Sequence, residues 1–299
     1  MKLTKLYDPK NGQLQVAGLM SGSGTNLRKI IGLEKSLANS SFHVCVIFSD
    51  NAESNAVKIG REFDIPVIVR DIKEFYAAQG KPLKDLQVRE EFDKETMKSL
   101  KQFNAKVAAY AGYMSIATKP LINAFLGINV HPGDLSKIDS QGKRKFVGGA
   151  HIPAMKAILA GEKELRSTTH IIEDKLDYGR ILMLSPALKV ELPENFNPED
   201  KELLNAISKE HQGRLKEAGD WIVFPKTLQA IAEGKFSQDE KGKLYFEEKE
   251  IPQGFSMEKK PEAKNAHKCI RCNSEPLVTD EEIKSEICSF CYDKEIFAD

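Results

Sequence analysis

The chain has 299 residues, of which 41% are hydrophobic, and its 44 Lys and Arg residues balance 44 Asp and Glu residues. This length and this apolar content supply a sizeable core and exclude a disordered chain. The zero net charge argues against a dedicated nucleic-acid binder. No apolar run reaches signal-peptide or membrane-spanning length, so we expect a cytoplasmic protein with no membrane partner.

Apolar segments alternate with amphipathic ones through the first half of the chain. This alternation predicts an α/β fold, with a mostly parallel, doubly wound, Rossmann-like sheet covered on both faces. We expect strands at residues 14–20, 43–48, 65–69, 105–111 and 126–130, and helices at 27–37, 52–63, 87–103 and 118–124. After residue 160 the pattern predicts two successive strands (166–173 and 180–192), helices at 201–216 and 226–233, and a hairpin around 243–247.

The C-terminal part of the chain has a different composition. A polar stretch at 258–267 predicts a linker between a domain at 1–257 and a small unit at 268–299. That unit holds two Cys-x-x-Cys pairs, formed by Cys269, Cys272, Cys288 and Cys291. Their spacing predicts a structural zinc in a zinc-ribbon-like unit, and redox pairs or unbound thiols are the alternative. The role of the unit stays open between a lid, a dimer contact and a contact with protein or RNA, and the sequence does not determine the oligomeric state.

The fifth cysteine, Cys45, lies in a predicted apolar strand. There it is expected to act as a small core residue.

A glycine-containing loop follows the first predicted strand and opens a helix. Its residues are Ser21, Gly22, Ser23, Gly24, Thr25 and Asn26. Glycines allow close backbone approach, and the N–H groups of a helix N-terminus favour an anion, so the loop predicts a phosphate site. It fits neither a Walker motif nor a dinucleotide fingerprint. The alternative is a helix start capped by Thr25 or Asn26.

Asn129 and His131 lie two residues apart at the end of a predicted strand, so both side chains face the same side. An amide and an imidazole together can stabilise a developing oxyanion if a carboxylate lies near the histidine. Asp177, in an acidic loop between two strands, is the candidate carboxylate, and we expect it to raise the pKa of His131. A strand end with satisfied polar side chains, and a turn stabilised by Asp177, are the alternatives.

The triplet Lys143-Arg144-Lys145 is a candidate local basic patch in a chain without net charge. Such a triplet is usually a solvated loop.

Four motifs occur in the order and approximate spacing of the folate-dependent formyltransferases. They are Ser21 to Leu27, Ala111 to Met114, Ile128 to Pro132, and Asp177-x-Gly179. The chain resembles this family over residues 13–257, and most of all the branch that formylates glycinamide ribonucleotide in purine biosynthesis. The resemblance implies 10-formyltetrahydrofolate as co-substrate and a small amine that carries a phosphate as acceptor.

The resemblance also implies a role for each matching residue. Asn129 and His131 would polarise the formyl carbonyl and hold a tetrahedral intermediate, while Asp177 would keep His131 protonated and relay a proton. Residues 21–26 would bind the phosphate, Glu210 would contact the ribonucleotide, and His170 would be a supporting group. The folate would lie against Tyr113, Met114, Ser115, Ile116, Ala117, Ile172, Glu173 and Asp174.

The chain departs from the family pattern where the acceptor and the folate tail are expected. Gly133-Asp134-Leu135-Ser136 follows the His-Pro pair, a longer loop covers 137–147, and Ser115 replaces an arginine. About ten extra residues separate Glu210 from Pro225. Three alternatives therefore stay open: another acceptor such as an amino sugar nucleotide, a hydrolase that releases formate, and a non-catalytic protein that binds RNA or protein.

Overall fold

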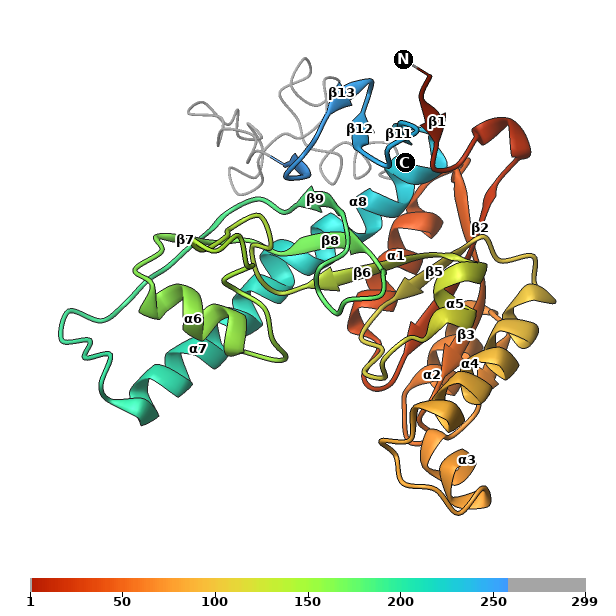
Figure 1. Cartoon of the computed structure of the whole chain (residues 1–299), viewed down its shortest axis with the longest axis horizontal. Coiled ribbons are helices and arrows are strands. Elements are labelled where there is room, and N and C mark those ends of the chain that lie inside the picture. The colour runs from red at the N-terminus through yellow and green to blue at the C-terminus, as the bar shows by residue number, and fades with distance from the viewer. Residues whose placement is uncertain (1, 258–299) are drawn as a thin grey trace, which may run out of the picture. The chain divides into compact units, whose positions relative to one another are not determined.

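The computed structural model describes residues 2–257, and its centre is an eight-stranded sheet of order β14-β9-β8-β6-β5-β2-β3-β4 (Figure 1). The strands are β2 (Leu14–Met20), β3 (Phe42–Ser49), β4 (Val67–Val69), β5 (Val107–Tyr110), β6 (Leu126–His131), β8 (Thr168–Ile171), β9 (Ile181–Leu184) and β14 (Phe255–Ser256). Strands β2 to β6 pair in parallel, and β8 pairs antiparallel with both β6 and β9. The predicted mostly parallel α/β sheet is confirmed.

Helices cover both faces of this sheet (Figure 1). They are α1 (Thr25–Ser36), α2 (Ala56–Phe63), α3 (Ile72–Ala78), α4 (Leu86–Lys101), α5 (Lys119–Ala124), α6 (Ile152–Leu159), α7 (Lys201–Leu215) and α8 (Trp221–Ala232). Val16 and Val44 pack with α1, α2 and α8 on one face, whereas their neighbours Ala17 and Cys45 pack with α4 and α5 on the other. This alternation of neighbouring residues is the strand periodicity of two acting on a sheet with two buried faces.

Two small sheets complete the described residues. One contains β1 (Thr4–Lys5), β11 (Phe236–Gln238), β12 (Leu244–Phe246) and β13 (Lys249–Glu250), and the other pairs β7 (Glu164–Leu165) with β10 (Leu188–Lys189). A 3₁₀ turn (Pro9–Asn11) precedes β2, and a π-helical turn (Lys216–Asp220) joins α7 to α8. Among residues 2–257, none of the helices combines the length and apolar character needed to span a bilayer.

Several sequence predictions need correction. Helices α3 and α6 were not predicted, because both are short and carry only one or two turns of periodic pattern. The predicted strand 180–192 is two strands, β9 and β10. The last predicted helix begins five residues early, at Trp221, because Pro225 lies inside α8 and not before it.

Cys45 is buried in the core, as predicted. The four C-terminal cysteines lie outside the described residues, so the zinc unit stays a prediction.

Candidate active site

The candidate site lies at the carboxyl ends of the central strands. Strand β2 pairs with β3 on one side and β5 on the other, so the chain reverses its order here, and ligands of open α/β sheets bind at such a point. The loops after β2 and β5 are joined: the N–H of Ser21 donates to the carbonyl of Gly112 (3.0 Å), and the N–H of Met114 donates to Ser21 Oγ (2.9 Å). The predicted phosphate loop and the predicted folate segment are therefore neighbours.

Gly24 sets the geometry of the predicted phosphate loop. Its φ is +69°, and a Cβ there would lie 2.4 Å from Ile59 Cδ1, so only glycine fits this tight passage. Gly24 is also the N-cap of α1, and no side chain caps the helix, which corrects the alternative of a Thr25 or Asn26 cap. The first N–H groups of α1 thus lack a side-chain partner and carry the positive end of the helix dipole.

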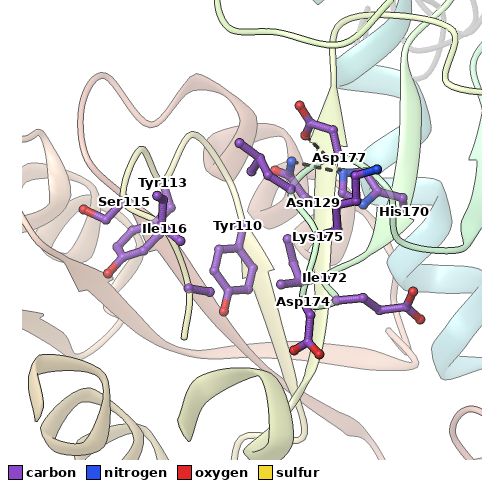
Figure 2. A pocket seen from close by; sticks show the side chains of 13 residues that line it. Tyr110, Tyr113, Ser115, Ile116, Asn129, His170, Ile172, Asp174, Lys175 and Asp177 are labelled. Atoms are coloured by element: carbon purple, nitrogen blue, oxygen red, sulfur yellow. Dashed lines mark hydrogen bonds and ion pairs between the residues drawn. The ribbon is translucent and has the colours of Figure 1, made fainter. Parts of the chain in front are cut away.

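A cavity of about 270 Å³ opens beside Tyr113 and Ser115 in the segment that is bonded to this loop (Figure 2). Its lining comes from β5, β6 and β8 and from the segments that follow β5 and β8: Tyr110, Tyr113, Ser115, Ile116, Ala117, Asn129, His170, Ile172, Glu173, Asp174, Lys175, Leu176 and Asp177. Seven of the eight predicted folate residues are in this set. The exception is Met114, whose side chain is 78% exposed. Tyr110 was missed by the sequence analysis, although its pairing with Asn129 in the parallel sheet would have indicated it.

Asn129 and His170 contact each other across the antiparallel pair β6–β8. They are register partners, and Asn129 Nδ2 lies 3.3 Å from His170 Nε2 (Figure 2). The other ring nitrogen, Nδ1, lies 2.9 Å from the carbonyl of Ile171 and must donate to it. Burial lowers the pKa of His170 to about 4, so its neutral ring accepts a hydrogen bond from the Asn129 amide through Nε2. One amide N–H of Asn129 is then oriented, and the second remains available to a ligand.

His131 is buried at the end of β6, and its ring lies between the backbone of Phe146 and the carboxylate of Asp177. Nε2 donates to the Phe146 carbonyl (2.7 Å), and Nδ1 lies 3.6 Å from Asp177 Oδ2. Burial lowers the pKa of His131 more than Asp177 raises it. Asp177 raises the pKa of His131, as expected, but the net lowering corrects the expectation that Asp177 keeps His131 protonated. The free ring is neutral at physiological pH, with its proton on Nε2 and with Nδ1 able to accept one.

Asp177 lies in a tight loop between the two histidines. Its Oδ1 is 3.8 Å from His170 Nε2, and its φ is +57°, a left-handed conformation that few residues other than glycine adopt. Two residues on, a Cβ at Gly179 would lie 1.7 Å from the Ile171 carbonyl oxygen. The Asp-x-Gly motif therefore lets the loop cross closely over β8 and brings the carboxylate to the histidines.

Glu210 is not brought to this cavity. It is exposed on α7, which packs against α6, and it does not line the cavity. A different carboxylate, Asp220, lies in the π-helical turn beside Asn26 and Ser167. Burial raises the pKa of Asp220 to about 6, against the lowering effect of Ser167 and Asn26. Asp220 was not among the residues predicted for the site.

The fold and the cavity thus define an α/β protein with an amide, two histidines and a carboxylate gathered at the carboxyl end of the sheet. Residues 14–195 match the formyl transferase family, which is more than half of the chain. The chain belongs to the formyl transferase family, as its motifs predicted.

Individual relatives agree with this assignment. The chain is 26% identical over 247 residues to phosphoribosylglycinamide formyltransferase of Haemophilus influenzae, covering 82% of this chain and 99% of the relative. It is 25% identical over 237 residues to the trifunctional purine biosynthetic protein adenosine-3 of Gallus gallus. That match covers 79% of this chain but only 20% of the much longer relative.

Solved structures share the fold. Phosphoribosylglycinamide formyltransferase from Coxiella burnetii superposes with a TM-score of 0.61 at 22% identity, covering 82% of this chain and 99% of that one. The corresponding enzyme from Anaplasma phagocytophilum gives a TM-score of 0.58 at 22% identity. The full length of these two chains is therefore represented within the present fold.

Proposed function

We propose that this protein transfers the formyl group of 10-formyltetrahydrofolate to the amine of glycinamide ribonucleotide. The observation that carries the proposal is that Asn129 and Asp177 line one cavity with the predicted folate segments, while the buried His131 ring faces Asp177 across 3.6 Å. Family membership and the relatives that carry this activity support it. The phosphate-type loop beside the cavity gives the acceptor a place to bind.

The reaction needs a hydrogen-bond donor at the formyl oxygen. Attack of the acceptor nitrogen on the formyl carbon forms a C–N bond and places negative charge on oxygen. The second amide N–H of Asn129, whose orientation the bond to His170 fixes, would donate to that oxygen. One donor of this kind typically contributes ~10²–10³ in rate.

The reaction also needs a proton acceptor. The attacking amine loses a proton, and N10 of the folate gains one as the old C–N bond breaks. Neutral His131 would take up the proton at Nδ1, since Nε2 is already committed to the Phe146 carbonyl. The imidazolium formed would lie beside Asp177, whose negative charge favours it, so Asp177 supports proton transfer without touching the formyl group.

The acceptor assignment rests on the loop at residues 21–26. The uncapped N-terminus of α1 would bind the phosphate of the ribonucleotide, and Asp220, beside Asn26, is better placed than Glu210 to contact its sugar. Another phosphorylated amine would bind the same loop.

The test is a folate-product assay with glycinamide ribonucleotide and a panel of other amines, including amino sugar nucleotides. We expect turnover with the ribonucleotide. Turnover with a different amine alone would contradict the acceptor but keep the chemistry. Release of formate with every amine omitted would point to a hydrolase, and tight, salt-sensitive RNA binding without any turnover would point to a binding protein.

We also propose that Cys269, Cys272, Cys288 and Cys291 bind one structural zinc, because four thiolates satisfy a tetrahedral zinc and leave no open position. Metal analysis of the purified chain should give about one zinc, and replacing two of the cysteines with serine should remove it. Full zinc content in that variant would contradict the proposal.

Since the two substrates of the proposed reaction are small metabolites, we infer a cytoplasmic location.

A further inference from the structure

The longer loop at residues 137–147, where the chain departs from the family pattern, is an ordered hairpin. The N–H of Lys145 donates to the Lys137 carbonyl (2.9 Å), and the N–H of Asp139 donates to the Lys143 carbonyl (2.8 Å). At its tip, Asp139 Oδ1 accepts from the N–H groups of Gln141 and Lys143, both at 2.8 Å. These hydrogen bonds give the hairpin a defined backbone geometry, which orients its side chains.

The basic triplet in this hairpin is not a uniform solvated cluster. Lys143 and Lys145 are exposed, whereas Arg144 is half-buried and turned toward the Asp177 loop. Arg144 Nη1 donates to the Asp177 carbonyl, and Nη2 donates to the Gly179 carbonyl at 2.9 Å. A guanidinium has a rigid fork of donors that can hold two acceptors at once, which a lysine cannot reproduce.

The same hairpin also reaches the other member of the catalytic pair. The carbonyl of Phe146, two residues after Arg144, accepts the hydrogen bond from His131 Nε2. One short segment therefore contacts the backbone that carries Asp177 and the ring that Asp177 faces. Asp177 has an unfavourable left-handed φ, so its conformation needs outside support, and Arg144 bonds the carbonyl of that residue.

We propose that Arg144 is a positioning residue for formyl transfer, which holds the Asp177 backbone so that the carboxylate faces His131 Nδ1. The proposal rests on the proposed function. Arg144 acts through the Asp177 and Gly179 carbonyls and does not line the cavity that holds Asn129 and Asp177. A misplacement of a reacting group by about 1 Å typically costs on the order of 10² in rate, so the hairpin is a condition for turnover in this chain.

The kinetic test compares Arg144→Ala, Arg144→Lys and the matched control Lys143→Ala, which removes an exposed charge from the same hairpin. We expect Arg144→Ala to lower kcat by about 10–100-fold while KM for 10-formyltetrahydrofolate stays within about threefold. Millimolar guanidinium should restore part of the lost kcat in Arg144→Ala only. An Arg144→Ala enzyme with kcat within twofold of the parent, or an equal loss in Lys143→Ala, would overturn the proposal.

A second measurement does not depend on turnover. The titration of His131 can be followed by NMR with labelled histidine, since the chain has only six histidines and a His131→Gln variant assigns the signal. Arg144→Lys keeps the positive charge, so a lower titration midpoint of His131 in this variant reports that Asp177 has moved away. An unchanged midpoint overturns the positioning role. A lowered midpoint in a protein that formylates no amine keeps the positioning role and rejects the proposed function.

Discussion

Two regions contact the His131–Asp177 pair, and they do so by different means. Strands β6 and β8 supply Asn129 and His170 as register partners, so their side chains meet because of the sheet itself. The hairpin at 137–147 supplies the guanidinium of Arg144 and the carbonyl of Phe146, and hydrogen bonds within the hairpin orient both groups. The first region contains the Ile128 to Pro132 motif, whereas the second lies where the sequence departs from the expected family pattern. The comparison teaches that a segment outside the motifs can contact the residues that the motifs supply.

The largest expected effects lie on the sheet side. Asn129→Ala removes the donor to the developing oxyanion and should lower kcat by ~10²–10³, and His131→Ala should do at least as much because it removes the proton acceptor. Steady-state assays check both. Asn195→Ala, which removes an exposed amide from the segment between β10 and α7, is the matched control and should keep full activity. Near-normal rates in both active-site variants would end the oxyanion proposal.

Asp177→Asn should have a smaller effect on rate. Asparagine tolerates the left-handed conformation of residue 177, so the loop should keep its shape while the charge beside His131 is lost. We expect kcat to fall by about 10–100-fold with little change in the midpoint of chemical denaturation. A large loss of stability would show instead that the carboxylate mainly holds the loop.

The sequence could predict the sheet side because its rules are periodic. Alternation placed Asn129 and His131 on one face, and the continuous apolar strands predicted a sheet covered on both sides. The contact between His131 and Asp177, by contrast, depends on how the 174–179 loop crosses β8, and no local pattern specifies that path. Arg144 lay in a triplet that composition alone assigns to a solvated loop. The turn geometry of the hairpin determines that Arg144, and not Lys143 or Lys145, turns inward.

Stability should depend on pH through the buried histidines. The pKa of His170 is about 4 in the folded chain, below its ordinary value, so the unfolded chain binds the proton first as pH falls from about 6.5 to about 4. Stability is therefore present above about pH 6.5 and is lost across this window, at up to roughly 1.4 kcal/mol per pH unit for one proton. Asp220, with a raised pKa of about 6, acts in the opposite sense as pH falls. His131 adds to the loss.

Denaturation of the parent and of His170→Gln at several pH values separates these contributions. The variant lacks the titrating ring, so its stability should depend less steeply on pH between about 6.5 and 4. Equal slopes would show that folding does not lower the pKa of His170.

The smallest expected effect concerns two carboxylates, Glu210 on α7 and Asp220 in the π-helical turn that follows α7. Glu210 is exposed on α7, and Asp220 is buried beside Asn26 at the start of α1. If the phosphate-bearing acceptor binds at that helix start, Glu210→Gln should leave its KM within twofold, whereas Asp220→Asn should raise it by about tenfold, as for the loss of one charged hydrogen bond. Steady-state kinetics with a varied acceptor compares the two. An effect of Glu210→Gln as large as that of Asp220→Asn would place the acceptor elsewhere, because Glu210 is exposed on α7 and does not line the cavity.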